Sequence, residues 1–182
     1  MASLMMIYMV MMYVMLLVFS VISYILGGKS LSAIARRRGI EKPWLAWVPV
    51  GNLWLLGCIS DQYRYVVHGQ QTNRRGKMLT LGSIVVIGGS VAGIASGVVA
   101  QAGISESGLL LILLPLYGIV AVSVVLSVQQ YMAYYDLFRS CDPDKSLVYL
   151  LVGIFAAFPL PFFVYSCRNK DLGMPPKSEA SD

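Results

Sequence analysis

The charged residues of this chain are confined to short segments that long uncharged stretches separate. Five stretches contain no Asp, Glu, Lys or Arg: 1–28, 43–60, 78–105, 107–135 and 146–167. All except 43–60 are long enough to cross a hydrocarbon core of roughly 30 Å, which needs about 20 mostly apolar residues. The composition agrees, because 57% of residues are hydrophobic and only 13% are charged. Because backbone groups in lipid must pair within their own segment, we expect an all-α integral membrane protein.

The predicted organisation is one polytopic membrane domain over 1–172 with a tail, 173–182, that is rich in Pro, Ser and charge and is expected to be disordered. The first uncharged stretch lacks a basic n-region, and its apolar run exceeds the 7–15 residues typical of a signal peptide. We therefore interpret it as a retained anchor. We expect about four hydrophobic membrane segments, at residues 4–27, 78–101, 109–135 and 146–167.

The last apolar stretch contains two prolines, Pro159 and Pro161, which remove helix hydrogen bonds and clash with the preceding turn. If this stretch crosses the membrane, the basic residues Arg168, Lys170 and Lys177 lie outside, against the positive-inside rule. If it turns back at the prolines, they stay on the cytoplasmic side. We favour four spans and keep a re-entrant hairpin as the open alternative.

Basic residues flank the apolar stretches on one predicted face. Of fourteen cations, nine lie within 29–77: Lys29, Arg36, Arg37, Arg38, Lys42, Arg64, Arg74, Arg75 and Lys77. The positive-inside rule places the loops of 29–77 in the cytoplasm and the N-terminus outside. Because these cations form clusters beside hydrophobic segments, they favour anionic lipid as a partner and not nucleic acid.

A tryptophan-rich segment at 43–67 lies between the two basic clusters. Its first part is broken by Pro43, Pro49 and Gly51, so we expect it to lie in the interface or, as the alternative, to be re-entrant. Indole rings favour that interface. Asn52 is the predicted N-cap of the helix that follows.

The basic stretch before this segment has an apolar face of its own, formed by Leu31, Ile34 and Ala35. Two interpretations stay open for it: a short helix along the lipid headgroups, or a stop-transfer charge cluster.

Gly89, Gly93 and Gly97 form a small-residue stripe in the predicted span 78–101. Glycines four residues apart let a second backbone approach closely, where packing in lipid is strongest. The stripe predicts helix packing, either with a neighbour in the same chain or with another subunit. The next span contains Pro115, which predicts a kink.

The run ARRRGI at 35–40, followed by PWLAWVPVGNL at 43–53, resembles a pattern in small integral membrane proteins of Gram-positive bacteria. In that pattern a basic RGI turn precedes a W-x-A-W-[IV]-P-x-x-N segment. The ending RNKDLGMP at 168–175 is similar to theirs as well. The resemblance implies a bacterial plasma-membrane setting and a shared scaffold, and it implies no mechanism.

Residues with catalytic or metal-binding chemistry are few and scattered. The three cysteines, the single His68 and the acids Asp61 and Asp136 show no metal-ligand spacing, and no hydrolase, zinc-protease or phosphate-loop motif occurs. We therefore predict no enzyme activity, no cofactor and no metal site.

The function we predict is a membrane subunit or scaffold that packs or oligomerises through the glycine stripe, as a homo-oligomer or in a larger membrane complex. A collar of aromatic and basic residues would contact membrane lipid: Arg36, Arg37, Arg38, Trp44, Trp47, Trp54, Arg74 and Arg75. The alternative is a small transporter or channel component that uses the broken segments 43–60 and 146–167.

Overall fold

A computed structural model describes residues 2–102, 106–156 and 158–175, and these residues form helices joined by short turns, with no strand among them. The predicted all-α fold is therefore confirmed for the described chain. In order the elements are α1 (Ala2–Arg37), the 3-10 helix η1 (Pro43–Trp47), α2 (Pro49–His68), α3 (Arg74–Ala102), α4 (Glu106–Cys141), α5 (Ser146–Phe155) and α6 (Leu160–Cys167).

Three helices are long and apolar enough to cross a membrane. They are Leu4–Arg37 within α1, Arg74–Val98 within α3 and Leu113–Cys141 within α4. The fourth predicted span, 146–167, is divided into α5 and α6, which have 10 and 8 residues. Neither reaches the roughly 20 residues that a crossing helix needs. The break lies at the prolines where the sequence predicted it, with Pro159 immediately before α6.

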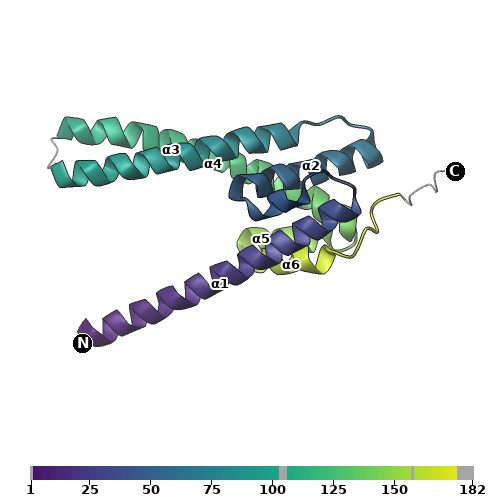
Figure 1. Cartoon of the computed structure of the whole chain (residues 1–182), viewed down its shortest axis with the longest axis horizontal. Helices are drawn as coiled ribbons and strands as arrows, with labels where there is room; N and C mark the ends of the chain where they lie inside the picture. The colour runs from purple at the N-terminus through teal and green to yellow at the C-terminus, as the bar shows by residue number, and fades with distance from the viewer. Residues whose placement is uncertain (1, 103–105, 157, 176–182) are drawn as a thin grey trace.

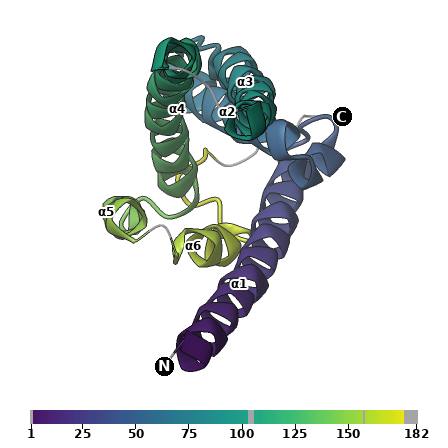
Figure 2. The same ribbon diagram turned by 90° about the vertical axis from the view of Figure 1, so that its left-hand side faces the viewer.

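The long helices extend from a packed cluster of shorter elements (Figure 1). We call this cluster the head; it contains η1, α2, α5 and α6 with the C-terminal ends of α1 and α4 and the start of α3. Helices α3 and α4 pack against each other, whereas α1 packs on α2, η1 and α6. Within the described chain α1 does not approach α3 or α4 closely. Figures 1 and 2 both show α1 diverging from the α3–α4 pair.

The hydrophobic core lies in the head. The apolar face predicted for the stretch after the first span is part of it, because Leu31, Ile34 and Ala35 are fully buried. These residues belong to α1, which continues through Gly27 and Gly28 as far as Arg37. The stretch is therefore the last part of α1 and not a separate helix, and its apolar face contacts protein.

The tryptophan-rich segment forms η1 and α2, and it packs on α1, α3 and α4. Gly57 lies where α2 crosses α3, and a Cβ atom there would lie 2.6 Å from the Cα of Arg75. Helix α2 begins at Pro49 after Val48 in extended conformation. The prediction that Asn52 is the N-cap is therefore wrong, because proline already occupies the first helical position and Asn52 lies one turn in.

The chain after α6 returns to the end of α4. The N–H of Leu172 donates to the carbonyl of Cys141 (3.2 Å), and the N–H of Gly173 donates to that of Ser140 (3.1 Å). Lys170 also forms an ion pair with Asp142 at 3.0 Å. The segment α5–α6 therefore starts and finishes at the same end of α4. Of the predicted tail, 173–175 is described and 176–182 lies outside the described residues.

Candidate functional site

A buried carboxylate joins three helices inside the head. Asp136 of α4 is 3% exposed, and one of its oxygens accepts hydrogen bonds from Ser60 (2.6 Å), Arg64 (2.8 Å) and Arg74 (2.9 Å). Ser60 and Arg64 belong to α2, and Arg74 begins α3. Because a buried charge is tolerated only when it is paired and hydrogen-bonded, this cluster holds α2, α3 and α4 in one arrangement.

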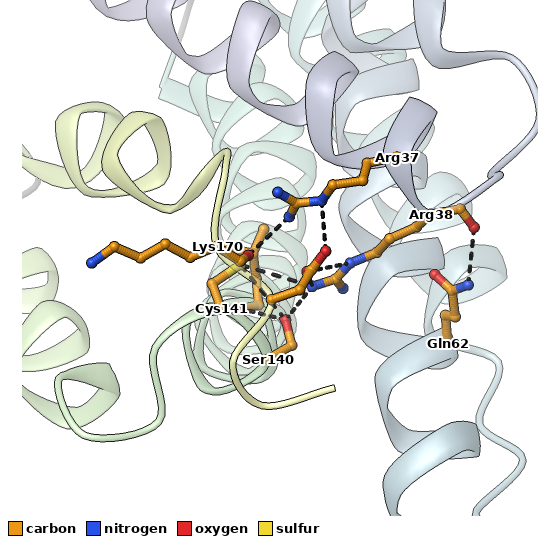
Figure 3. A network of polar contacts seen from close by, with 8 residues as sticks. Arg37, Arg38, Gln62, Ser140, Cys141 and Lys170 are labelled. Atoms are coloured by element: carbon orange, nitrogen blue, oxygen red, sulfur yellow. Dashed lines mark hydrogen bonds and ion pairs between the residues drawn. The ribbon is translucent and has the colours of Figure 1, made fainter. Parts of the chain in front are cut away.

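A second polar cluster holds the segment that follows α6 (Figure 3). Arg38 donates to Asp171 at 2.7 Å and to the hydroxyl of Ser140 at 2.8 Å, and its own carbonyl accepts from Gln62. Its side chain is only 3% exposed. Arg37 forms an ion pair with the same Asp171 at 2.5 Å. The end of α1, the end of α4 and the C-terminal segment are therefore tied together by charge-assisted hydrogen bonds.

A groove with positively charged walls runs along the head next to this cluster. It has a volume of about 650 Å³, within the usual range of ligand sites of roughly 300–1,000 Å³. The described residues that line it include four cations and no carboxylate: Lys29, Ser32, Ala33, Arg36, Arg37, Trp47, Arg168 and Asn169. We call it the basic groove. Two segments more than a hundred positions apart contribute to it, so its positive potential is a product of the fold.

Trp47 is held in the basic groove by α1. Its ring lies over Gly28, where a Cβ atom would be 3.1 Å from the indole, and its carbonyl accepts a hydrogen bond from Tyr24. Trp47 is still 39% exposed. Gly28 therefore provides the space for an indole that remains accessible at the groove.

The residues predicted to contact lipid differ in how exposed they are. Arg36 is exposed and Trp44 is 58% exposed. Trp54 is partly buried against the core. The remaining arginines differ: Arg75 is exposed, Arg37 is half-buried, and Arg38 and Arg74 lie inside the two polar clusters. Arg38 and Arg74 therefore support the head from inside, because their guanidinium groups are occupied by Asp171 and Asp136.

Among the basic groove residues, Lys29 and Arg168 were not among the predicted site residues. Arg168 stacks on the ring of Tyr165 at 3.8 Å, which orients its guanidinium. The sequence pointed to Arg168 through the conflict between a fourth span and the positive-inside rule. A hairpin at 146–167 removes that conflict, because it keeps the cations after it on the same side as the other basic residues.

The glycine stripe lies on an exposed face of α3. Helix α3 packs on α4 through its other side, where a Cβ atom at Gly88 would meet Ile119 at 3.3 Å. At Gly89, Gly93 and Gly97 an added Cβ atom would meet nothing within 4 Å. No neighbour in the described chain uses the stripe.

The acid and thiol groups that the sequence offered for chemistry are used structurally. Asp61 accepts from the hydroxyl of Thr72 and from the backbone N–H groups of Arg74 and Arg75, so it caps the start of α3. Burial raises the pKa of Cys58 to about 11, and the positive charge of Arg75 opposes this shift. The thiol is therefore protonated and unreactive at neutral pH.

No cluster of three His, Cys, Asp or Glu side chains with metal-binding spacing occurs in the described residues. Comparison with protein-family models, curated proteins and solved structures gives no match.

Proposed function

We propose that this chain is a non-enzymatic membrane subunit whose head binds anionic lipid phosphates of the inner leaflet through the basic groove. The observation that carries the proposal is the convergence of Lys29, Arg36 and Arg168 on one groove beside an accessible indole. Arg37 also lines the groove, but Asp171 and the carbonyl of Lys170 hold its guanidinium. Guanidinium groups match phosphate oxygens in a bidentate manner. Each cation near an anionic leaflet contributes about 1 kcal/mol.

The topology follows from the positive-inside rule and the path of the chain. The head lies on the cytoplasmic face, α1 crosses with its N-terminus outside, and α3 and α4 form a hairpin across the membrane. Helices α5 and α6 form a re-entrant hairpin on the cytoplasmic side, because each is too short to cross and the chain returns to α4. The resemblance to Gram-positive membrane proteins supports a bacterial plasma membrane.

Fluorescence quenching in nanodiscs tests lipid binding at the basic groove. In a Trp44→Phe/Trp54→Phe background, Trp47 is the only indole, and it lies in the groove. We expect brominated phosphatidylglycerol to quench it more strongly than brominated phosphatidylcholine at equal content.

Arg36→Gln should reduce this difference at least twofold, because Arg36 lies in the groove and is exposed. Lys77→Gln is the matched control, since it removes an exposed cation of the same face that does not line the groove. Equal quenching by the two lipids, or equal effects of the two variants, would contradict the proposal.

A second role rests on the glycine stripe, which we propose as a contact with a second copy of the chain. Its support is that Gly89, Gly93 and Gly97 are open while α4 covers a different side of α3. Gly93→Leu should shift the protein to a smaller species on sizing in mild detergent. The control is Val91→Leu, at a position that is also exposed but lies off the stripe. An unchanged elution of Gly93→Leu would contradict self-association through this face.

A further inference from the structure

A polar cavity of about 290 Å³ lies between α1 and α4, where the long helices enter the head. Its floor and walls come from four helices: Ser23 and Tyr24 from α1, Asn52 from α2, Ser127, Gln130, Tyr131 and Tyr134 from α4, and Leu160, Pro161 and Val164 from α6. The amide of Asn52, which is not the N-cap that the sequence predicted, is one of these lining groups.

The polar groups of this cavity are all uncharged. Hydroxyls and amides line it, and no Lys, Arg, Asp or Glu is among its described lining residues. The hydroxyl oxygen of Ser23 is buried there and has no hydrogen-bond partner in the described structure. Because buried polar groups are normally hydrogen-bonded, a hydroxyl without a protein partner favours a ligand that donates or accepts a hydrogen bond at this point.

The two long helices that form walls of the cavity have exposed apolar side chains. Helix α1 does not approach α4 in the described chain, and the two helices diverge from the head (Figure 2). Apolar side chains one to two turns beyond the lining remain exposed on both helices, including Leu16 of α1, seven residues before Ser23, and Val124 of α4, three residues before Ser127. A ligand that fits has an uncharged head for the cavity and apolar chains that lie against the exposed apolar side chains of the two helices.

The cavity and the basic groove use different sides of α1. Ser23, Gly27 and Leu31, four residues apart, share the side that faces the cavity. Lys29, Ala33 and Arg36 face the groove instead. The two sites therefore differ in charge and in the lipid chemistry they select.

We propose that this cavity binds the neutral, hydroxyl-bearing head of a diacylglycerol-type lipid that enters between α1 and α4. Asn52, Gln130 and Ser23 would hydrogen-bond the hydroxyl and ester groups of the head. An anionic phosphate head is disfavoured, because no lining cation compensates its charge when it leaves water.

Photolabelling of the full chain in nanodiscs tests this assignment. The probe is a dioleoylglycerol with a diazirine close to the glycerol, and the comparison probe is the matching phosphatidylglycerol. We expect the neutral probe to label residues 20–28 and 123–134, none of which lines the basic groove. An excess of unlabelled dioleoylglycerol should abolish that labelling. The same excess of unlabelled phosphatidylglycerol should leave most of the labelling in place.

The variant Gln130→Leu should reduce labelling about tenfold, whereas Gln129→Leu, the same change one residue away and outside the lining, should leave it intact. Ser23→Ala is a minimal second variant, since alanine suits a helix and the change removes only an unpartnered hydroxyl. It should weaken labelling severalfold in a protein that folds normally. Equal labelling by both probes, unsaturable labelling, or equal loss in Gln129→Leu and Gln130→Leu would overturn the proposal.

Discussion

At the scale of single residues, Asp136 joins three helices of the head. Its carboxylate is buried and faces two guanidinium groups, those of Arg64 and Arg74. Removing its charge would leave Arg74 buried beside Arg64 without its ion-pair partner. The cost of breaking a buried ion pair in this way is about 3–5 kcal/mol.

Asp136→Asn should therefore lower the free energy of unfolding by about 3–5 kcal/mol. The measurement is unfolding in mixed detergent and SDS micelles. The control is Asp144→Asn, the same change at an exposed position just beyond α4, which should cost almost nothing. The role assigned to Asp136 fails if the two variants unfold at the same SDS fraction.

Cys58 offers a test of burial by chemistry. With a pKa raised from 9.0 to about 11, its thiolate fraction near pH 8 should be about 100-fold below that of an ordinary thiol. A variant that retains only Cys58 should react with a soluble maleimide about 100-fold more slowly than one whose single thiol comes from Ser166→Cys, at an exposed position. The rate should rise with pH towards 11, and equal rates at pH 8 would exclude a buried thiol.

Residue types alone did not separate interface arginines from structural ones. Arg36, Arg37 and Arg38 belong to one basic run, but Arg36 is exposed, whereas Arg37 and Arg38 meet the carboxylate of Asp171. Asp171 lies 133 positions after Arg38. Arg74 meets Asp136 across 62 positions. Such partners depend on the tertiary fold, so the sequence showed the basic run but could not tell which of its arginines pair inside the head.

At the scale of elements, the uncharged stretches predicted the long helices well. The helix in the first stretch continues beyond its apolar part, because the buried face of Leu31, Ile34 and Ala35 gives the basic end of α1 a place to pack. Periodicity showed that face but not whether it contacts lipid or protein. The break between α5 and α6 was predictable from proline chemistry, whereas the return of the chain to α4 depends on contacts made after the break.

The crossing of α2 and α3 depends on the absence of one side chain. At Gly57 an added Cβ atom would lie 2.6 Å from the Cα of Arg75 and 2.8 Å from its nitrogen, and backbone cannot move aside as a flexible side chain does. Gly57→Ala should force the helices apart and cost about 1–3 kcal/mol by overpacking.

SDS-induced unfolding measures this cost, and Gly118→Ala is the control. Gly118 lies in α4, where an added Cβ atom would meet nothing within 4 Å, so the change should be neutral or slightly stabilising. If Gly57→Ala is as stable as Gly118→Ala, the close approach of α2 and α3 is not part of the native fold.

At the scale of the whole molecule, the chain has one charged head at one end of three long helices. Two polar clusters, around Asp136 and Asp171, join elements that are distant in the sequence. The basic groove and the neutral cavity lie on different sides of α1 within this head. Both proposed lipid sites therefore depend on the head lying at a single membrane face.

The number of crossings decides that placement. With three crossings and a re-entrant α5–α6 hairpin, the N-terminus and the C-terminus lie on opposite sides of the membrane. With four crossings, they lie on the same side, and Arg168 and Lys170 would be separated from the basic face that they contact in this structure.

Cysteine accessibility at both ends of the chain measures this most directly. In a background with the native cysteines replaced by serine, one variant carries Ser3→Cys and another Ser178→Cys. We predict that an impermeant maleimide added to intact cells labels only the first, and that inverted membrane vesicles label only the second. Labelling of both variants from the same side would contradict a single charged head on one membrane face.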